Sequence, residues 1–405
     1  MALTGDVSTG RRAVLLAVSV ATCGVIPAFL TGGLAVQIRD ELNFGEGALG
    51  LAVAVFFASS SLASFLSGRI VERIGYSLGM RAAVLASAAS LLVVALLARS
   101  WLALILCLAF GGLANAISHP ATHLFMARRI SQGRQGLAFG VKQAAIPTAT
   151  LLAGLAVPSL GTTIGWRWAF VAAAALALVV LLLVPNGGSA TGLRRPRDRA
   201  IRTGDARLGP LLLLALGMAL GSAAANPLGA FVVESSVAAG IEVGTAGLLL
   251  AAGSGVGIVV RVLLGWLTDR REGGSLNLVA GMMVLGTLGF LLLADGGRWA
   301  LVIGVLLAFG AGWGWPGLFN FAVVKTSPGA PAAATGVTQT GASGGAAIGP
   351  LVFGLIAEGS SFGTAWLVSG ALVLLAAAAI LVGRRMLLRD RRAQDRERLA
   401  ALDAS

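Results

Sequence analysis

The sequence predicts an all-α integral membrane protein, with twelve transmembrane helices in two parallel six-helix repeats around a central cavity. Hydrophobic residues make up 57% of the chain and charged residues 12%, with a mean hydropathy of +0.89. A soluble domain carries roughly 25% charged residues. Two short motifs also recur: Gly68–Arg73 returns as Gly265–Arg270, and Gly140–Gln143 as Gly336–Gln339. The two offsets agree to within one residue, which indicates homologous halves in the same orientation.

The apolar runs give six spans in each half, which suits 405 residues at roughly 20 residues per span. The expected spans are 13–36, 48–68, 80–98, 101–127, 136–158 and 166–185, then 209–234, 244–268, 276–294, 299–324, 333–357 and 363–383. We therefore expect an N-terminal bundle (1–185), an arginine-rich cytoplasmic linker (186–208), a C-terminal bundle (209–383) and a basic cytoplasmic tail (384–405).

The basic residues predict the orientation. With both termini in the cytoplasm, 24 of the 30 lysines and arginines fall on the inside. Only Arg39, Arg99, Arg167 and Arg298 fall outside. We expect a multi-pass protein of the inner (cytoplasmic) cell membrane. The same distribution explains the net charge of +13 by contact with anionic lipid, so no nucleic-acid partner is expected.

The repeated loop resembles the signature between helices two and three of the major facilitator superfamily, Gly-x-Leu-Ala-Asp-Arg-x-Gly-Arg-Lys. The first copy here keeps Gly68, Arg73 and Gly75, carries Glu72 in place of the aspartate, and lacks the final basic pair. The second copy keeps Gly265, Asp269 and Arg270. This resemblance implies two six-helix bundles that work by alternating access.

A gate is the role that we expect for these two loops. A glycine at a helix end allows close approach of another helix. An acid one turn later can pair with a basic group or a helix N-terminus across the seam. The alternative is that the charges only end a helix in water. The expected gating residues are Gly68, Glu72, Arg73, Gly265, Asp269 and Arg270.

Two cations lie within predicted spans without a carboxylate at a similar depth. Lys142 lies in span five and Arg261 in span eight, each roughly 10 Å deep at 1.5 Å per residue. Burying a charge at this depth costs roughly 2.5–3.5 kcal/mol. In the superfamily fold these spans face each other, so an anionic substrate could bridge the two cations. The alternatives are that Lys142 reaches the cytoplasmic interface and that Arg261 binds backbone carbonyls at a gate.

Polar residues on spans four, seven and ten add candidates for the cavity wall. Asn115, His119 and His123 are spaced by four residues and share one helix face. Histidine titrates near neutral pH, so His119 and His123 are the expected proton-coupling residues. The resemblance implies that helices one, four, seven and ten line the cavity. The remaining substrate-binding candidates are Asn226 on span seven and Trp313 and Asn320 on span ten. The equivalent residues of the second repeated motif, Gln143 on span five and Gln339 on span eleven, complete the set.

These features favour a secondary transporter of a small organic anion, coupled to protons. An exporter of hydrophobic or drug-like compounds is the alternative, supported by aromatic residues and by the glycine run from Gly341 to Pro350. A non-transporting membrane sensor is a remote third interpretation. No phosphate loop or Cys–His pairing is present, so we expect no enzyme, cofactor or metal site. The expected partners are the substrate, protons and the bilayer, with a monomeric protein.

Overall fold

The computed structural model describes residues 4–130, 135–185, 208–268, 275–326 and 331–403. The described part contains twelve helical segments that are long and apolar enough to cross a membrane, as the sequence predicts. The helices of the first half are α1 (Thr4–Gly33), α2 (Ala35–Leu42), α3 (Glu46–Ile74), α4 (Tyr76–Leu97), α5 (Trp101–Arg129), α6 (Gln135–Lys142), α7 (Ala145–Ala156) and α8 (Trp166–Leu183). Those of the second half are α9 (Leu208–Ala238), α10 (Val243–Thr268), α11 (Ser275–Asp295), α12 (Arg298–Leu307), α13 (Pro316–Thr326), α14 (Pro331–Gly359) and α15 (Phe362–Asp403).

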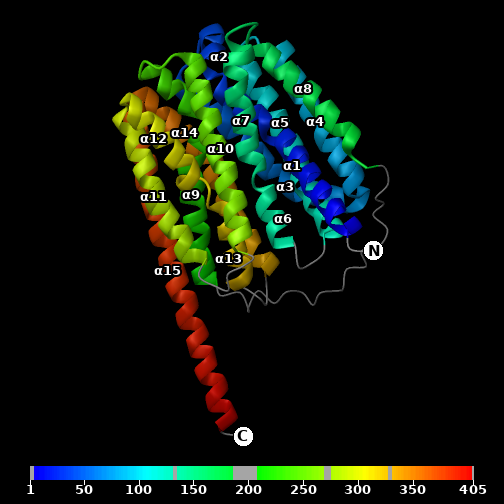
Figure 1. Ribbon diagram of the computed structural model, residues 1–405, viewed down its shortest axis with the longest axis vertical. Coiled ribbons are helices and arrows are strands. Elements are labelled where there is room, and N and C mark those ends of the chain that lie inside the picture. Colours follow the sequence, from blue (N-terminus) through cyan, green and yellow to red (C-terminus); the bar gives the residue numbers. More distant parts are fainter. Residues whose placement is uncertain (1–3, 131–134, 186–207, 269–274, 327–330, 404–405) are drawn as a thin grey trace.

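The two ends of the chain lie on the same side of the bundle (Figure 1). We call this the termini side, and we call the opposite side, where α2 lies, the far side. The helix α15 runs well past the bundle toward the C-terminus (Figure 1). The helix continues to Asp403, and the candidate span that begins at Phe362 extends to Arg389, past the predicted boundary at residue 383. The predicted linker, 186–208, lies outside the described residues except for Leu208.

Spans five and ten are each interrupted, which the apolar pattern alone did not predict. Span five breaks between α6 and α7 and ends in a π-helical turn, Val157–Gly161. Pro147 has no N–H to donate to the carbonyl of Gln143, four residues earlier, so the break coincides with a freed acceptor. Span ten breaks between a π-helical turn, Ala308–Gly312, and α13, which begins at Pro316. Pro316 likewise frees the carbonyl of Gly312, which accepts a hydrogen bond from Trp315 Nε1 at 2.8 Å.

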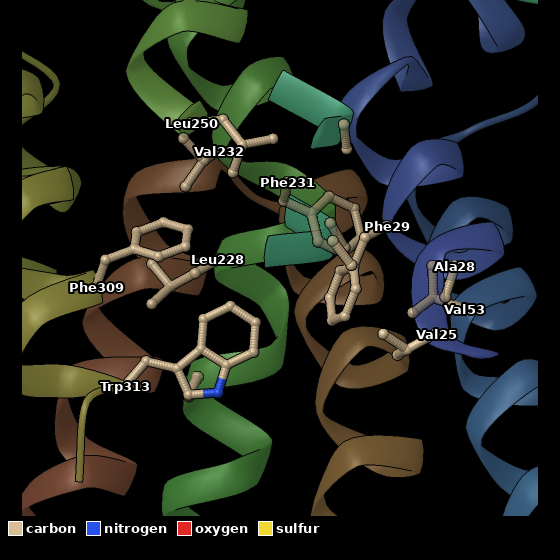
Figure 2. Packing of buried hydrophobic residues seen from close by; sticks show 14 of the residues in the cluster. Val25, Ala28, Phe29, Val53, Leu228, Phe231, Val232, Leu250, Phe309 and Trp313 are labelled. Atoms are coloured by element: carbon tan, nitrogen blue, oxygen red, sulfur yellow. The ribbon is translucent and has the colours of Figure 1, made fainter. Parts of the chain in front are cut away.

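Small residues bring the two halves into direct backbone contact. Gly32 on α1 packs against the backbone of Ala230 on α9, and Gly154 on α7 packs against Ala251 on α10. A larger residue at either glycine would force the helices apart. An aromatic cluster also joins the two halves: the rings of Phe29 and Trp313 meet edge to face, with centroids 5.8 Å apart (Figure 2). The two halves therefore share one continuous core.

The helix α14 also packs tightly within its own half. Gly341, Gly345 and Gly349 recur every four residues and each meets the backbone of α9. This spacing places all three on one face of the helix. The glycine run that supported the exporter alternative therefore has a packing role in this structure.

The pair α3 and α14 is closed on the far side and open on the termini side. Gly50 on α3 packs against the backbone of Pro350 and Leu351 on α14. About five helical turns later on the same face of α3, Gly68 has empty space around it out to 4 Å among the described residues. On α14, Pro350 is buried, whereas Gln339, about three turns earlier on the same face, is exposed.

Candidate functional site

One face of α5 likewise changes from buried to exposed toward the termini side. Gly112 packs against the backbone of Phe56 and the hydroxyl of Ser59 on α3. His119 and His123 follow two and three turns later on this face, and both side chains are exposed. Their rings lie edge to face with centroids 6.4 Å apart. The two histidines therefore lie where α3, α5 and α14 open toward the termini side.

Lys142 lies at the C-terminal end of α6, beside this opening. Its side chain is buried, with a residue exposure of 5%, and its Nζ lies 3.4 Å from His119 Nδ1. A lysine ammonium group can only donate, so this contact requires an unprotonated Nδ1 on His119. The structure thus brings together two predicted site residues, one expected to bind substrate and one to carry protons.

Arg261 on α10 joins the two interrupted spans. One Nη group donates to the backbone carbonyl of Gln143, and the other donates to the carbonyl of Trp313 at 2.6 Å. These carbonyls belong to the ends of helical segments from opposite halves, where the helix dipoles favour a cation. The guanidinium also lies over the indole of Trp313, 5.9 Å from the ring centroid. Its Nε is buried and has no hydrogen-bond partner among the described residues.

The amide side chains predicted to line the cavity divide into two groups. Asn115 and Asn226 are buried, and each bonds within its own half: Asn115 to Ser60 at 2.9 Å and Asn226 to the carbonyl of Ser222 at 2.8 Å. Asn320 is half-buried with an unpaired Oδ1 in the described region. Gln339 is exposed. Gln143 is also half-buried, and Asn115 Oδ1 is buried without a hydrogen-bond partner among the described residues. Gln143, Asn320 and Gln339 are therefore the predicted amides that are accessible to a ligand.

The structure describes four of the six predicted gating residues, and it places them differently in the two halves. Glu72 and Arg73 are exposed near the C-terminal end of α3. They follow Gly68 by about one helical turn, and a Cβ atom at Gly68 would have no other helix within 4 Å among the described residues. Gly265 on α10 lies beside Gly140 on α6. A Cβ atom at residue 140 would be in van der Waals contact with the Cα of Gly265, at 3.9 Å. Asp269 and Arg270 lie outside the described residues.

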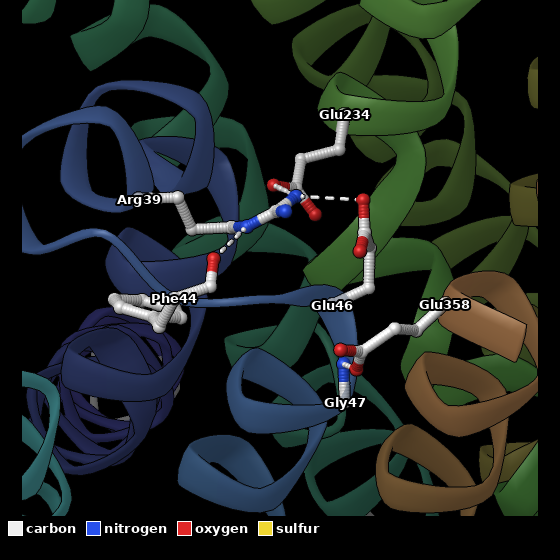
Figure 3. A network of polar contacts seen from close by, with 6 residues as sticks. All are labelled: Arg39, Phe44, Glu46, Gly47, Glu234 and Glu358. Atoms are coloured by element: carbon white, nitrogen blue, oxygen red, sulfur yellow. Dashed lines mark hydrogen bonds and ion pairs between the residues drawn. The ribbon is translucent and has the colours of Figure 1, made fainter.

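A polar network on the far side was not predicted from the sequence (Figure 3). Arg39 on α2 pairs with Glu234 on α9 at 2.6 Å and with Glu46 on α3 at 3.0 Å. Glu358 on α14 accepts a hydrogen bond at 2.7 Å from the backbone N–H of Gly47, near the N-terminus of α3. Both the Arg39–Glu234 and the Glu358–Gly47 contacts join the two halves. The sequence alone does not predict these pairs, because they depend on which helix ends meet in the folded protein.

The chain resembles solved transporter structures over almost its whole length. A structure of a mutant of the nucleoside transporter NupG matches with a TM-score of 0.72 and 14% identity, covering 92% of this chain and 99% of that one. An inward-facing, occupied bacterial homolog of the human lysosomal transporter Spinster matches with a TM-score of 0.70 and 16% identity, covering 93% and 97%. The unoccupied form of the latter protein gives a TM-score of 0.69 and 16% identity, covering 94% and 98%. At these identities the likeness shows the fold alone.

Comparison with curated protein sequences gives no match. A family model does match: residues 14–345 fit the model of the Major Facilitator Superfamily. The matched range covers most of the chain, including most of the first predicted half and the second half as far as residue 345. It agrees with the twelve candidate membrane spans and with the resemblance of the repeated loop. The chain belongs to the major facilitator superfamily.

Proposed function

We propose that this protein is a secondary transporter that moves a small organic anion by alternating access, with protons as the coupling ion. The superfamily and fold support transport in general. The anion and the proton rest on the side chains near the opening. In this proposal the termini side is the cytoplasmic side of the inner membrane, as the arginine distribution predicts, and the protein acts as a monomer without a catalytic step.

The observation that carries the proposal is the contact between Lys142 and His119. A buried ammonium group with one neutral partner is poorly compensated, because burying a charge is costly unless it is paired. Acidic side chains within the described spans lie only near span ends: Glu46, Glu72, Glu234, Asp295 and Glu358. A carboxylate delivered by the substrate would supply the missing counter-charge.

Proton coupling follows from the same contact. A proton on His119 Nδ1 would place a second positive charge beside Lys142, 3.4 Å away. Like charges at this distance repel, and an anion bound to both would remove the repulsion. Binding of the anion therefore favours protonation, and protonation favours binding, which is the linkage that a proton-coupled carrier needs. His123 lies next to His119 and can share this role.

Arg261 has a different part in this proposal. Its two Nη groups are occupied by carbonyls from both halves, so it holds the spans together in this conformation. It would bind the anion directly only after those bonds open. Gln339 and Asn320 are proposed to bind the polar end of the substrate, Glu72 and Arg73 to form the gate that closes the termini side, and Gly68 and Gly265 to allow its close approach.

Binding measurements with a panel of small mono- and dicarboxylic acids test the proposal. Lys142→Ala should weaken binding of the transported acid by about 10- to 150-fold, equivalent to the roughly 1.5–3 kcal/mol of a hydrogen bond to a charged group. Lys325→Ala, which removes an exposed lysine near the end of α13, is the matched control and should bind normally. The double variant His119→Gln with His123→Gln should flatten the pH dependence of transport.

An exporter of hydrophobic compounds is the second candidate. The aromatic contacts of Phe29 with Phe57 and with Trp313 favour it, since they give the centre of the molecule an apolar surface. Native-strength binding of the transported compound by Lys142→Ala would support this candidate and contradict the anion proposal.

A further inference from the structure

We propose that Glu234 is a proton-binding residue on the far-side gate, and that protonating it opens that gate. This goes beyond the anion site, which lies on the opposite side of the aromatic cluster. The inference rests on three features of the network in Figure 3: the pairing of Arg39, the burial of Glu234 and the closed backbone contacts around them.

Arg39 is anchored to the first half whether or not Glu234 is present. Its Nε donates to the carbonyl of Phe44 at 2.9 Å, and its Nη1 pairs with Glu46 at 3.0 Å. Glu234 Oε1 provides the contact to the second half, at 2.6 Å from the same nitrogen. Separation of the two halves would therefore leave Arg39 with its local partners, whereas Glu234 would lose the cation that it pairs with.

Glu234 is the buried member of the network. Its side chain is 3% exposed, compared with 21% for Arg39 and 24% for Glu46. Its second oxygen, Oε2, is buried and has no hydrogen-bond partner among the described residues. The charged groups around it are Arg39 and Asp40 on α2 and Glu46 on α3, with Glu358 of α14 bonded to the adjacent Gly47. Apart from Arg39, all of these neighbours are acidic and disfavour a second negative charge.

Opening the far side requires the Arg39–Glu234 pair to separate. Breaking a buried ion pair by removing one partner is strongly unfavourable, because it leaves an uncompensated charge. A proton on Oε2 removes that charge, so the protonated carboxyl group can part from Arg39 at lower cost. A proton from the far side is therefore a ligand of the open state and shifts the conformational equilibrium toward it.

Distances between spin labels on the far side test this proposal without any substrate. Labels at Asn43→Cys and Ser360→Cys report on exposed far-side loops of the two halves, after Cys23 and Cys107 are replaced by alanine. In the otherwise native protein, the population with the long distance should grow relative to the population with the short distance as pH falls. For one proton, the ratio of the two populations should rise by up to tenfold per pH unit. Glu234→Gln should abolish this dependence and favour the long distance at every pH.

Two further variants separate titration from loss of a contact. Glu234→Asp keeps a titratable carboxyl group and should retain a pH-dependent distance. Glu46→Gln removes the other partner of Arg39 and should also retain it. A pH response that persists in Glu234→Gln, or an absent response in the native protein, would overturn the proposal. Failure of the anion site would leave these distances unchanged, because no substrate is present.

Discussion

The two ends of the α3–α14 pair differ in how the same helix faces are used. Toward the far side, Gly50 meets the backbone of Pro350, and Glu46 on α3 lies against Gly354 on α14. Toward the termini side, Gly68 and Gln339 on the continuing faces meet open space or are exposed. The two helix faces are thus packed together toward the far side and apart toward the termini side. In the proposed alternating-access cycle, this pair would close at each end in turn as one half rocks against the other.

The pair α7 and α10 shows a contrasting behaviour, because it remains in contact along its length. Toward the far side, Gly154 packs against α10, and Thr150 Oγ1 lies 2.7 Å from Ser254 Oγ. Toward the termini side, Arg261 donates to the carbonyl of Gln143, just before α7. Contacts that persist along the whole pair suit a pivot, whereas contacts confined to one end suit a gate. The following predictions test this division.

The largest effect is expected from filling the glycine contact on the far side. Gly50→Leu should abolish transport, with activity at least about tenfold lower, because its side chain cannot coexist with the backbone of α14. The protein should then remain open on the far side, which the spin-label distance between Asn43→Cys and Ser360→Cys reports.

Gly68→Leu is the matched variant at the other end. Nothing in this conformation opposes its side chain, so the folded structure should be retained with the far side closed. Transport should nevertheless be lost, because the termini side can no longer close. Equal distances in Gly50→Leu and Gly68→Leu would argue against alternating use of the two faces.

The next effect concerns Arg261. Arg261→Gln leaves the buried backbone carbonyl of Trp313 and the partly buried carbonyl of Gln143 without their guanidinium donor. Each unsatisfied buried group costs about 1–3 kcal/mol, so unfolding in detergent should occur at clearly lower temperature or denaturant concentration. Arg261→Lys should recover only part of the lost stability. An ammonium group can still donate hydrogen bonds, but it cannot reproduce the planar two-pronged geometry of guanidinium. Native stability of Arg261→Gln would mean that these bonds contribute nothing.

A smaller effect is expected at the hydroxyl pair in the proposed pivot. Thr150→Val and Ser254→Ala should each destabilise the protein by about 0.5–1.5 kcal/mol, the usual net value of a hydrogen bond. The double variant should cost less than the sum, because the two residues share one contact. Additive effects on the unfolding midpoint would show that the pair is not coupled.

The smallest effect is expected at Glu41, whose partner lies in the same half. The hydrogen bond from Arg167 lowers the pKa of Glu41 from its ordinary value, and the Trp166 indole, 2.7 Å from Oε2, lowers it further. A lowered folded-state pKa gives stability that is present above the unfolded pKa and is lost as pH falls through the folded one. Glu41 is 45% exposed, so Glu41→Gln should slightly reduce the acid sensitivity of unfolding. The far-side distance should keep its pH dependence, in contrast to Glu234→Gln.

The sequence by itself determined the class of this protein. Apolar periodicity identified twelve spans, and the repeated motifs at Gly68 and Gly265 identified two halves and the superfamily. Both signals are local, since a span needs a run of apolar residues and a repeat needs only two similar segments. Lys142, His119 and Arg261 also stood out from sequence alone, because charged or titratable groups within apolar runs are unusual.

The tertiary structure decided what those groups touch. Pro147 and Pro316 were visible in the sequence, but only the packed helices show that Arg261 binds the carbonyls of Gln143 and Trp313. The pairing of Arg39 with Glu234 is also non-local, because it joins helices α2 and α9 across 195 residues of sequence. Side-chain type follows from the sequence, whereas a cross-half contact depends on how two bundles meet, and that is fixed by glycine contacts spread along several helices.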